Sequence, residues 1–199
     1  MTEVTAKDVK ALRDRTGAGV LACREALSEA GGDVEQAIEI LRTRGQAQAA
    51  RRAGEEAREG AVQAYIHQGN KIGAVVEVDC QTDFVARNQK FIEFTRDLAL
   101  HVAARAPLAV SDDEVPEQDR ERELRIATEQ AQERPEHVRE RIVAGKLESW
   151  LDEVVLLRQK HVNEDKYAGK TIEELRSELA VETRENIVVR RFARFAVGG

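Results

Sequence analysis

Residues 61–80 read AVQAYIHQGNKIGAVVEVDC and contain the clearest structural pattern in the chain. Their apolar side chains alternate with other residues in two runs: Val62, Ala64 and Ile66, then Ile72, Ala74, Val76 and Val78. Alternation with a period of two is typical of strands that bury one face. The connection between the runs contains Gly69 and Asn70, which tolerate the left-handed backbone of tight turns. The stretch therefore predicts a β-hairpin.

The rest of residues 61–199 predicts helices followed by one more strand. Helical spacing is found at Phe91, Phe94, Leu98 and Val102, and again at Val138, Ile142, Leu147, Leu151 and Val155. A charged, exposed helix is expected from about Pro116 to residue 134, and Thr171 with Glu174 forms a capping box for a later helix. Residues 187–195 are β-branched and aromatic. We expect an α+β domain with a small antiparallel three-stranded sheet packed with helices.

Residues 1–45 predict a three-helix module that resembles ubiquitin-associated domains in shape. Thr5 with Asp8 can cap a first helix, and Gly31 with Gly32 ends a second. Asp33 can cap a third. Residues 46–60 are rich in Ala, Arg and Glu and predict a connecting helix that ends at Gly60. The expected organisation is 1–45 as a docking module, 46–60 as a helical linker and 61–199 as the core domain.

Composition narrows the classes of function. The formal net charge is -6, which argues against direct nucleic-acid binding, because phosphate contacts need clustered Lys and Arg. No run of 18 apolar residues and no basic leader segment are present, so we expect a cytoplasmic protein without membrane insertion. Cys23 and Cys80 are too few for a disulfide scaffold and show no metal-binding spacing, so no metal or cofactor is expected. Their redox state is left open.

Catalysis has little support in the sequence. Cys80 with His67 or His101 could be proposed as a nucleophile and its base, but no spacing places them within reach of each other. A lone cysteine more often packs as a small hydrophobe. The paired Arg190 and Arg191 near two aromatics also match the known RNA-stacking platforms poorly. We therefore expect a protein that is not an enzyme.

The segment EVDCQTDFVARN, residues 77–88, follows the second strand of the predicted hairpin. From the residues alone, Asp83 is expected to cap the next helix and Phe84 to pack into the core. The segment RTGAG, residues 15–19, is expected to be an interhelical turn, and His67 a surface histidine at the hairpin turn. Each of these assignments is purely structural.

Three motifs in order give the chain a resemblance to the elongation factor Ts family. They are TDFVARN at residues 82–88, RTGAG at 15–19 and ENIVVRRF at 185–192, and they span nearly the whole chain. The resemblance implies a guanine nucleotide exchange factor that binds the GTPase elongation factor Tu and dislocates its Mg²⁺ ion. It implies that Mg²⁺ is displaced by Thr82, Asp83, Phe84 and Val85 at an exposed tip. The implied partner-binding residues are Arg15, Thr16, Gly17, Ala18, Gly19, Arg24, His67, Arg87 and Asn88.

The resemblance is not complete. The family usually has Ile-Gly where this chain has Thr183 and Arg184, and Gln-Pro-Phe-Val where it has Gln159, Lys160, His161 and Val162. The chain also contains a single strand-and-helix core unit, whereas long family members contain two, so we expect a homodimer that supplies the second copy. The alternative function is a peptide- or protein-docking module unrelated to nucleotide exchange.

Overall fold

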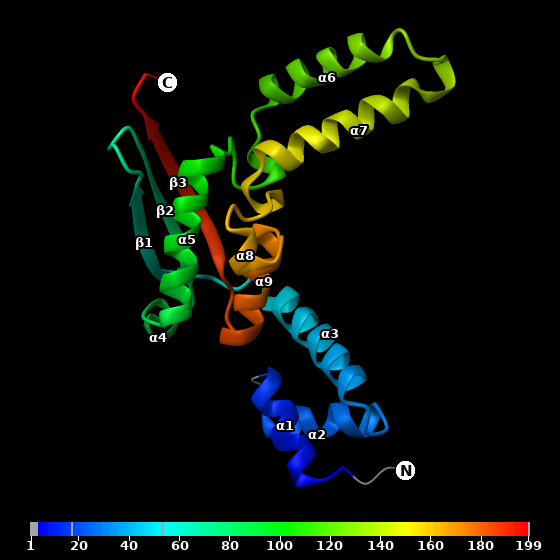
Figure 1. Cartoon of the computed structure of the whole chain (residues 1–199), viewed down its shortest axis with the longest axis vertical. Coiled ribbons are helices and arrows are strands. Elements are labelled where there is room, and N and C mark those ends of the chain that lie inside the picture. The colour runs from blue at the N-terminus through cyan, green and yellow to red at the C-terminus, as the bar shows by residue number, and fades with distance from the viewer. Residues whose placement is uncertain (1–3, 17, 53, 199) are drawn as a thin grey trace.

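The computed structural model describes residues 4–16, 18–52 and 54–198. The described chain has three parts (Figure 1). Helices α1 to α3 form the N-terminal end, a sheet covered by helices forms the body, and the hairpin of α6 and α7 projects from the body at the opposite end. This arrangement confirms the predicted α+β class.

The N-terminal helices are α1 (Ala6–Thr16), α2 (Val20–Glu29) and α3 (Val34–Arg52). The predicted first cap is confirmed: the Thr5 amide donates to Asp8 Oδ2 at 3.1 Å and the Asp8 amide donates to Thr5 Oγ1 at 3.3 Å. Asp33 Oδ1 likewise accepts from the Gln36 amide at 2.9 Å. A small core built on Leu12, Cys23 and Leu27, all fully buried, holds the three helices together.

The predicted connecting helix is continuous with α3, and its expected end at Gly60 is wrong. The helix passes through Gly45 and ends at Arg52. Gly45 permits close packing on α9, since a Cβ there would lie 2.7 Å from Val181 Cγ1. Gly60 instead belongs to the first strand, where a Cβ would lie 2.3 Å from the Val78 carbonyl oxygen. The close strand pairing, rather than a helix end, requires this glycine.

The sheet contains β1 (Glu59–Ile66), β2 (Ile72–Cys80) and β3 (Val188–Ala196) in the order β1-β2-β3, with both neighbours antiparallel. The predicted hairpin is confirmed. Its turn is closed by a bond from the His67 amide to the Ile72 carbonyl at 2.8 Å. Gly69 and Asn70 take the expected left-handed conformation, with φ of 88° and 57°.

The core of the body lies between one face of this sheet and the helices α5 (Gln89–Arg105) and α9 (Ile172–Thr183). Phe91, Leu98 and Val102 of α5 are almost fully buried against Val76 and Val78 of β2. The short helices α4 (Asp83–Ala86) and α8 (Glu164–Tyr167) precede α5 and α9. The predicted capping box of Thr171 and Glu174 opens α9. The other face of the sheet carries exposed apolar side chains.

The projecting hairpin consists of α6 (Glu117–Ala131) and α7 (Glu136–Val154), which confirms both predicted helices. Two short 3-10 helices, Asp112–Glu114 and Leu156–Arg158, lie at its base. The Arg158 guanidinium joins them, because its Nε donates to Asp112 Oδ1 at 2.7 Å. It also bonds Glu148 at 2.7 Å and Asp152 at 3.2 Å on α7. Arg158 therefore fixes the hairpin to the body.

Candidate functional site

The one-turn helix α4 at the end of β2 carries the most exposed large hydrophobic side chain in the described part of the chain. Phe84 on this helix is 83% exposed, whereas Ala86 is buried. The expectation that Phe84 packs into the core is wrong. Val85 and Ala86 occupy the inward side of this single turn, and successive helical residues differ by about 100° in direction, so Phe84 faces outward. We call Thr82–Val85 the tip.

Thr82, not Asp83, is the N-cap of α4. Its Oγ1 accepts a hydrogen bond from the Val85 amide at 3.4 Å, so the expectation that Asp83 caps the helix is also wrong. Asp83 lies in the first turn, where its carboxylate pairs with the Arg87 guanidinium at 3.1 Å. Arg87 has 81% of its side chain exposed, so this ion pair is open to water. Asn88 caps α5, because its Oδ1 accepts from the Lys90 amide at 2.8 Å.

The base of the tip is bonded to residues far away in the sequence. The Glu185 carboxylate, just before β3, accepts from the amides of Gln81 at 2.9 Å and Thr82 at 3.0 Å. It also accepts from the Thr82 hydroxyl at 2.5 Å. The Gln81 side chain donates to Glu55 Oε2 at 2.6 Å and accepts from the Asn186 amide at 3.0 Å. Gln81 and Glu185 lie within the quoted segments 77–88 and 185–192, but no pattern in the sequence indicates that they, with Glu55, hold the base of the tip.

Cys80 lies directly under the tip and is fully buried. Its thiol donates to the Thr82 carbonyl at 3.2 Å. Burial, and then the nearby Glu185 charge, raise the pKa of the Cys80 thiol to about 11. The thiol therefore stays protonated at neutral pH, which makes it a packing group and a poor nucleophile.

The RTGAG segment lies between α1 and α2, and Gly17 falls outside the described residues. The Thr16 hydroxyl donates to the Leu12 carbonyl at 2.8 Å and accepts from the Ala18 amide at 3.3 Å, so it shapes the turn. Arg15 is half-exposed and pairs with Glu35 at 2.8 Å. Gly19 is the N-cap residue of α2, and Arg24 on that helix is exposed. The structure thus leaves both arginines accessible to a partner.

Arg184 connects this segment with the tip. A Cβ on Gly19 would lie 3.5 Å from Arg184 Nη2, which places the guanidinium beside the turn. The next residue, Glu185, holds the base of the tip. Arg184 itself has a left-handed backbone with φ of 60°, at the position where the family pattern has glycine. The RTGAG segment and the tip therefore lie on the same side of the molecule.

His67 lies at the opposite end of the hairpin from the tip. It is exposed at the turn, and its Nδ1 is 3.0 Å from the Tyr65 hydroxyl. The nine residues of β2 separate this turn from the tip (Figure 1). At about 3.3 Å for each residue, the two ends of the strand are roughly 26 Å apart. The structure does not bring His67 together with the tip, so a partner that contacts both must span the sheet.

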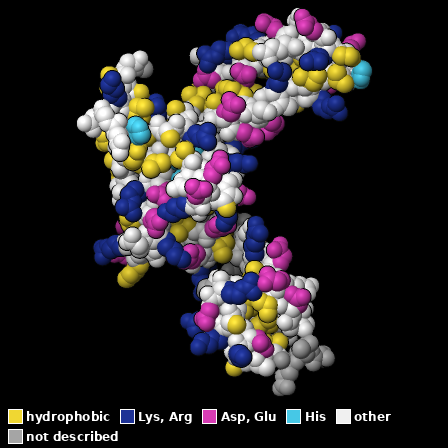
Figure 2. Space-filling view, in the orientation of Figure 1, with side chains coloured by type: hydrophobic (Ala, Val, Ile, Leu, Met, Phe, Trp, Pro, Cys, Tyr) yellow, Lys and Arg dark blue, Asp and Glu magenta, His cyan; other side chains and the backbone are white. Residues whose placement is uncertain are grey.

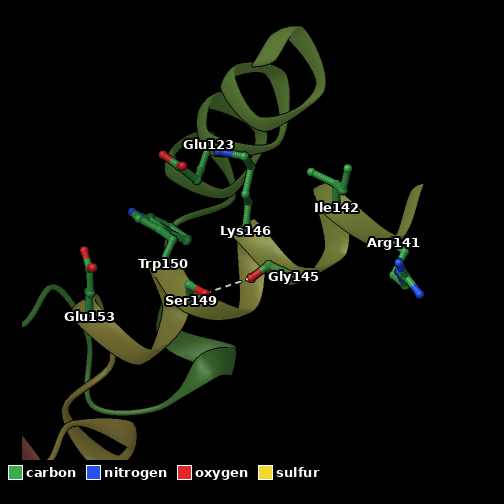
Figure 3. A pocket seen from close by; sticks show the side chains of 8 residues that line it. All are labelled: Glu123, Arg141, Ile142, Gly145, Lys146, Ser149, Trp150 and Glu153. Carbon is green, nitrogen blue, oxygen red and sulfur yellow. Dashed lines mark hydrogen bonds between the residues drawn. The ribbon is translucent and has the colours of Figure 1, made fainter. Parts of the chain in front are cut away.

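The other candidate sites have structural partners. His101 is fully buried and bonds Gln159 and Val162, whereas the Cys80 thiol bonds Thr82, so the proposed nucleophile and base are engaged elsewhere. A groove on the projecting hairpin is lined by Glu123, Arg141, Ile142, Gly145, Lys146, Ser149, Trp150 and Glu153 (Figure 3). The Ser149 hydroxyl donates to the Gly145 carbonyl of its own helix at 2.9 Å. Residues 4–16, 18–52 and 54–198 contain no cluster of three metal-ligating side chains.

The surface charge is mixed. Figure 2 shows Lys and Arg side chains interspersed with Asp and Glu over the visible face, without one continuous basic stripe. No helix in the described part of the chain is long and apolar enough to cross a bilayer. What distinguishes the described surface is an exposed aromatic side chain on a short helix whose base is bonded to the body. An exposed aromatic side chain on a fixed base is typical of a protein that binds another protein.

Comparison with known proteins identifies the kind of docking protein. The family model described as elongation factor TS matches residues 5–168. The chain is 46% identical over 198 residues to elongation factor Ts of Desulfotalea psychrophila, with 98% of each chain covered. It is 47% identical over 197 residues to elongation factor Ts of Moorella thermoacetica, with 98% of this chain and 96% of the relative covered.

These similarities extend over essentially the full chain, and the chain belongs to the elongation factor Ts family. It is a translation elongation factor that exchanges guanine nucleotide on elongation factor Tu, and it is not an enzyme. Family membership decides between the two functions left open by the sequence, in favour of the exchange factor over an unrelated docking module.

Proposed function

We propose that the tip drives GDP release by entering the nucleotide site of elongation factor Tu and displacing the bound Mg²⁺ ion, in the cytoplasm. The observation that carries the proposal is the 83% exposure of Phe84 on a helix whose neighbouring Ala86 is buried. Leaving a large aromatic side chain in water forfeits about 2 kcal/mol or more of apolar burial. A docked partner can recover that free energy.

Displacement of Mg²⁺ explains how a protein without catalytic chemistry accelerates release. The ion bridges the nucleotide phosphates to the GTPase, so its loss removes a large local attraction. Phe84 acts as the wedge, and the Asp83 carboxylate lies one residue away. Asp83 is paired with Arg87 through an exposed contact, which costs little to open because such pairs contribute about 0.3–0.5 kcal/mol. The carboxylate is thus available for a new partner.

The effect on nucleotide affinity must be reciprocal. If this factor binds nucleotide-free elongation factor Tu more tightly than the GDP-bound form, GDP weakens the binding of the factor by the same ratio. GTP then displaces the factor and completes the exchange. We propose that Arg15, Thr16, Ala18, Gly19 and Arg24 hold the partner on the tip side of the molecule. Gly17 in the same turn, His67 across the sheet, and Arg87 and Asn88 beside the tip complete the proposed contact surface.

The test measures the release of fluorescent GDP from elongation factor Tu by stopped flow. We expect wild type to accelerate release, and Phe84→Ala and Asp83→Ala each to reduce the rate by at least about tenfold, or about 1.4 kcal/mol. Both side chains are solvent-accessible, so the two variants should have the same thermal unfolding temperature as wild type. Leu124→Ala on α6, which is also exposed, is the matched control and should exchange at the wild-type rate. Wild-type rates in both tip variants would remove the wedge assignment.

We further propose that the chain forms a homodimer through the open face of its sheet. Five apolar side chains are exposed on or beside this face: Val62, Ile66, Val75, Phe195 and Val197. In the strand register Ile66 and Phe195 both pair with Gly73, so they flank a glycine at one end of the face. Val75 lies between Ala64 and Ala193. A monomer would leave this apolar patch in water, whereas two-fold pairing covers it.

Light scattering at micromolar concentration tests the dimer. We expect twice the mass of the chain for wild type and the mass of one chain for Phe195→Glu, because the new charge would be buried in the interface. Leu124→Glu places the same charge on the exposed side of α6 and should leave the mass of a dimer. A monomeric wild type would contradict the proposal.

We also propose three functional regions along the chain. Residues 1–45 dock onto the partner, residues 46–60 connect this module to the core domain, and residues 61–199 carry the tip and the dimer surface. The support for this division is the contact between α3 and the body, which begins near Gly45, where Val181 of α9 packs against the helix. Limited proteolysis should therefore cut first within residues 46–60, between α3 and the sheet, and release the N-terminal helices before it cuts the core. Cleavage that begins within the sheet would contradict this division.

A further inference from the structure

The shape of the tip cannot come from its own sequence. Helix α4 has four residues, and forming a single helical turn is unfavourable by itself because several backbone angles are fixed for one hydrogen bond. The hydrogen bond from the Val85 amide to Thr82 Oγ1 is long, at 3.4 Å. Other groups must therefore hold the segment between β2 and α5 in the conformation that turns Phe84 outward.

Glu185 supplies three of the hydrogen bonds that hold it. One carboxylate oxygen accepts from the amides of Gln81 and Thr82, and the other accepts from the Thr82 hydroxyl. That hydroxyl in turn accepts from the Val85 amide. The chain of bonds runs from Glu185 through Thr82 into the first turn of α4. It fixes the N-cap side chain at the residue where the strand changes into the helix.

A carboxylate suits this position better than an amide. All three groups that face Glu185 are donors, and an ionised carboxylate is an acceptor on both oxygens. A glutamine would keep one oxygen for the two amides, but its NH₂ group would reverse the bond with the Thr82 hydroxyl, and the negative charge would be lost. Hydrogen bonds to an ionised group are also about twice as strong as neutral ones. The position of Glu185 is itself fixed, since Asn186 beside it donates from its amide to Gln81 Oε1 and from its side chain to the Glu55 carbonyl.

We infer that Glu185 is a positioning residue for nucleotide exchange: it holds the tip in the conformation that presents Phe84. This inference rests on the proposed function of the tip. Glu185 touches neither the nucleotide nor the Mg²⁺ ion in this role, and it acts only through Thr82 and α4. Without it, the segment would sample other conformations, and the docked factor would insert Phe84 in a smaller fraction of encounters.

The experiment compares Glu185→Gln with Glu178→Gln, a matched control on α9. Glu178 is exposed and pairs with Lys170, so its substitution removes the same charge without touching the tip. GDP release is measured over a range of factor concentrations. For Glu185→Gln we expect the maximal rate to fall about tenfold, with the half-saturating concentration within about twofold of wild type, because the docking surfaces are intact. Glu178→Gln should match wild type in both.

Two further readouts separate positioning from general stability. In a double-mutant cycle, Glu185→Gln should slow the Phe84→Ala variant by less than about twofold, because the side chain that it positions is already gone. Hydrogen exchange of the amides of residues 81–86 should accelerate about tenfold or more, whereas exchange in β1 and β2 stays at the wild-type rate. Additive effects in the cycle, or unchanged exchange at 81–86, would overturn the inference.

If Glu185→Gln loosens the whole sheet, Thr82→Val provides the second variant, because it keeps the shape of the side chain and removes only the hydroxyl. It should lower the maximal rate about threefold, and a wild-type rate would overturn the inference. If wild-type factor fails to accelerate GDP release, the proposed function fails. The hydrogen exchange of residues 81–86 then still decides whether Glu185 holds the tip.

Discussion

Two buried histidines should make the stability of this protein depend on pH. His101 of α5 is fully buried, with its Nε2 2.8 Å from Gln159 Oε1 and its Nδ1 accepting from the Val162 amide at 3.1 Å. This pair of bonds needs the neutral ring with its proton on Nε2. A second proton would have to sit on Nδ1, facing the amide donor. Burial, aided by the charges of His161 and Arg105, lowers the pKa of His101 from 6.5 to about 4.

The size and direction of the effect follow from that difference in pKa. In the unfolded chain the histidine binds its proton near pH 6.5, whereas in the folded chain it does so only near pH 4. Protons therefore favour the unfolded state as pH falls through this window, and the free energy of unfolding decreases. One such group costs about 2 kcal/mol at pH 5 and about 3 kcal/mol below pH 4. His161, whose pKa is also lowered by burial, acts in the same direction.

Urea unfolding followed by circular dichroism at 222 nm measures this dependence. The free energy of unfolding of wild type should be nearly constant between about pH 7 and pH 8 and lower by at least about 2 kcal/mol at pH 5. His101→Gln should be less stable at pH 8 but show a smaller loss between pH 8 and pH 5. His137→Gln, at an exposed position on α7, is the control and should follow wild type. An equal loss in wild type and His101→Gln would show that His101 does not cause the pH dependence.

Three further substitutions test local features of the fold. Arg184→Gly should raise the free energy of unfolding by roughly 1 kcal/mol, because Arg184 has a left-handed φ of 60° that glycine adopts without strain; thermal unfolding that shows a loss would contradict this. Thr171→Ala removes the side chain that caps α9 and should lower stability by about 1 kcal/mol, measured in urea, with Ser149→Ala as a control. Arg158→Met should lower stability by roughly 1–3 kcal/mol and accelerate hydrogen exchange in α6 and α7, because the bonds from Arg158 to Asp112 join the hairpin to the body. Unchanged exchange in these helices would show that other contacts hold the hairpin.

Local patterns were sufficient for most of the fold. The alternation in residues 61–80 predicted the hairpin and its turn, although Val62 and Ile66 of β1 lie on the exposed face of the sheet. The caps at Thr5 and Thr171 were found because they depend on residues three apart. The helix boundary at Arg52 was missed for a physical reason. The Ala, Arg and Glu of residues 46–60 favour a helix up to Gly60, but Gly60 lies in β1, where a Cβ would lie 2.3 Å from the Val78 carbonyl oxygen of the paired strand.

Local patterns were less informative about the candidate site. Phe84 belongs in the core by its chemistry, and its exposure could be expected only from the resemblance of TDFVARN to a family motif. The contact that holds the tip does not follow from any local pattern, since Glu185 lies 103 residues from Thr82 in the sequence. The motifs therefore include the residues proposed to contact the partner, but they do not indicate which side chains hold the tip in place.

The tip depends on contacts with the segment that leads into β3. A four-residue helix is not stable by itself. The conformation of the tip therefore depends on the hydrogen bonds from Gln81 and Thr82 to Glu185, which lies just before β3. The same strand carries Phe195 at its other end, on the face proposed to pair with a second copy. Because β3 is a continuous element from Val188 to Ala196, a dimer that rigidifies the sheet would also stiffen the segment that fixes the tip. On this argument, Phe195→Glu should lower the maximal exchange rate even though the substitution lies far from Phe84, and a monomeric variant with the wild-type rate would separate the two functions of the sheet.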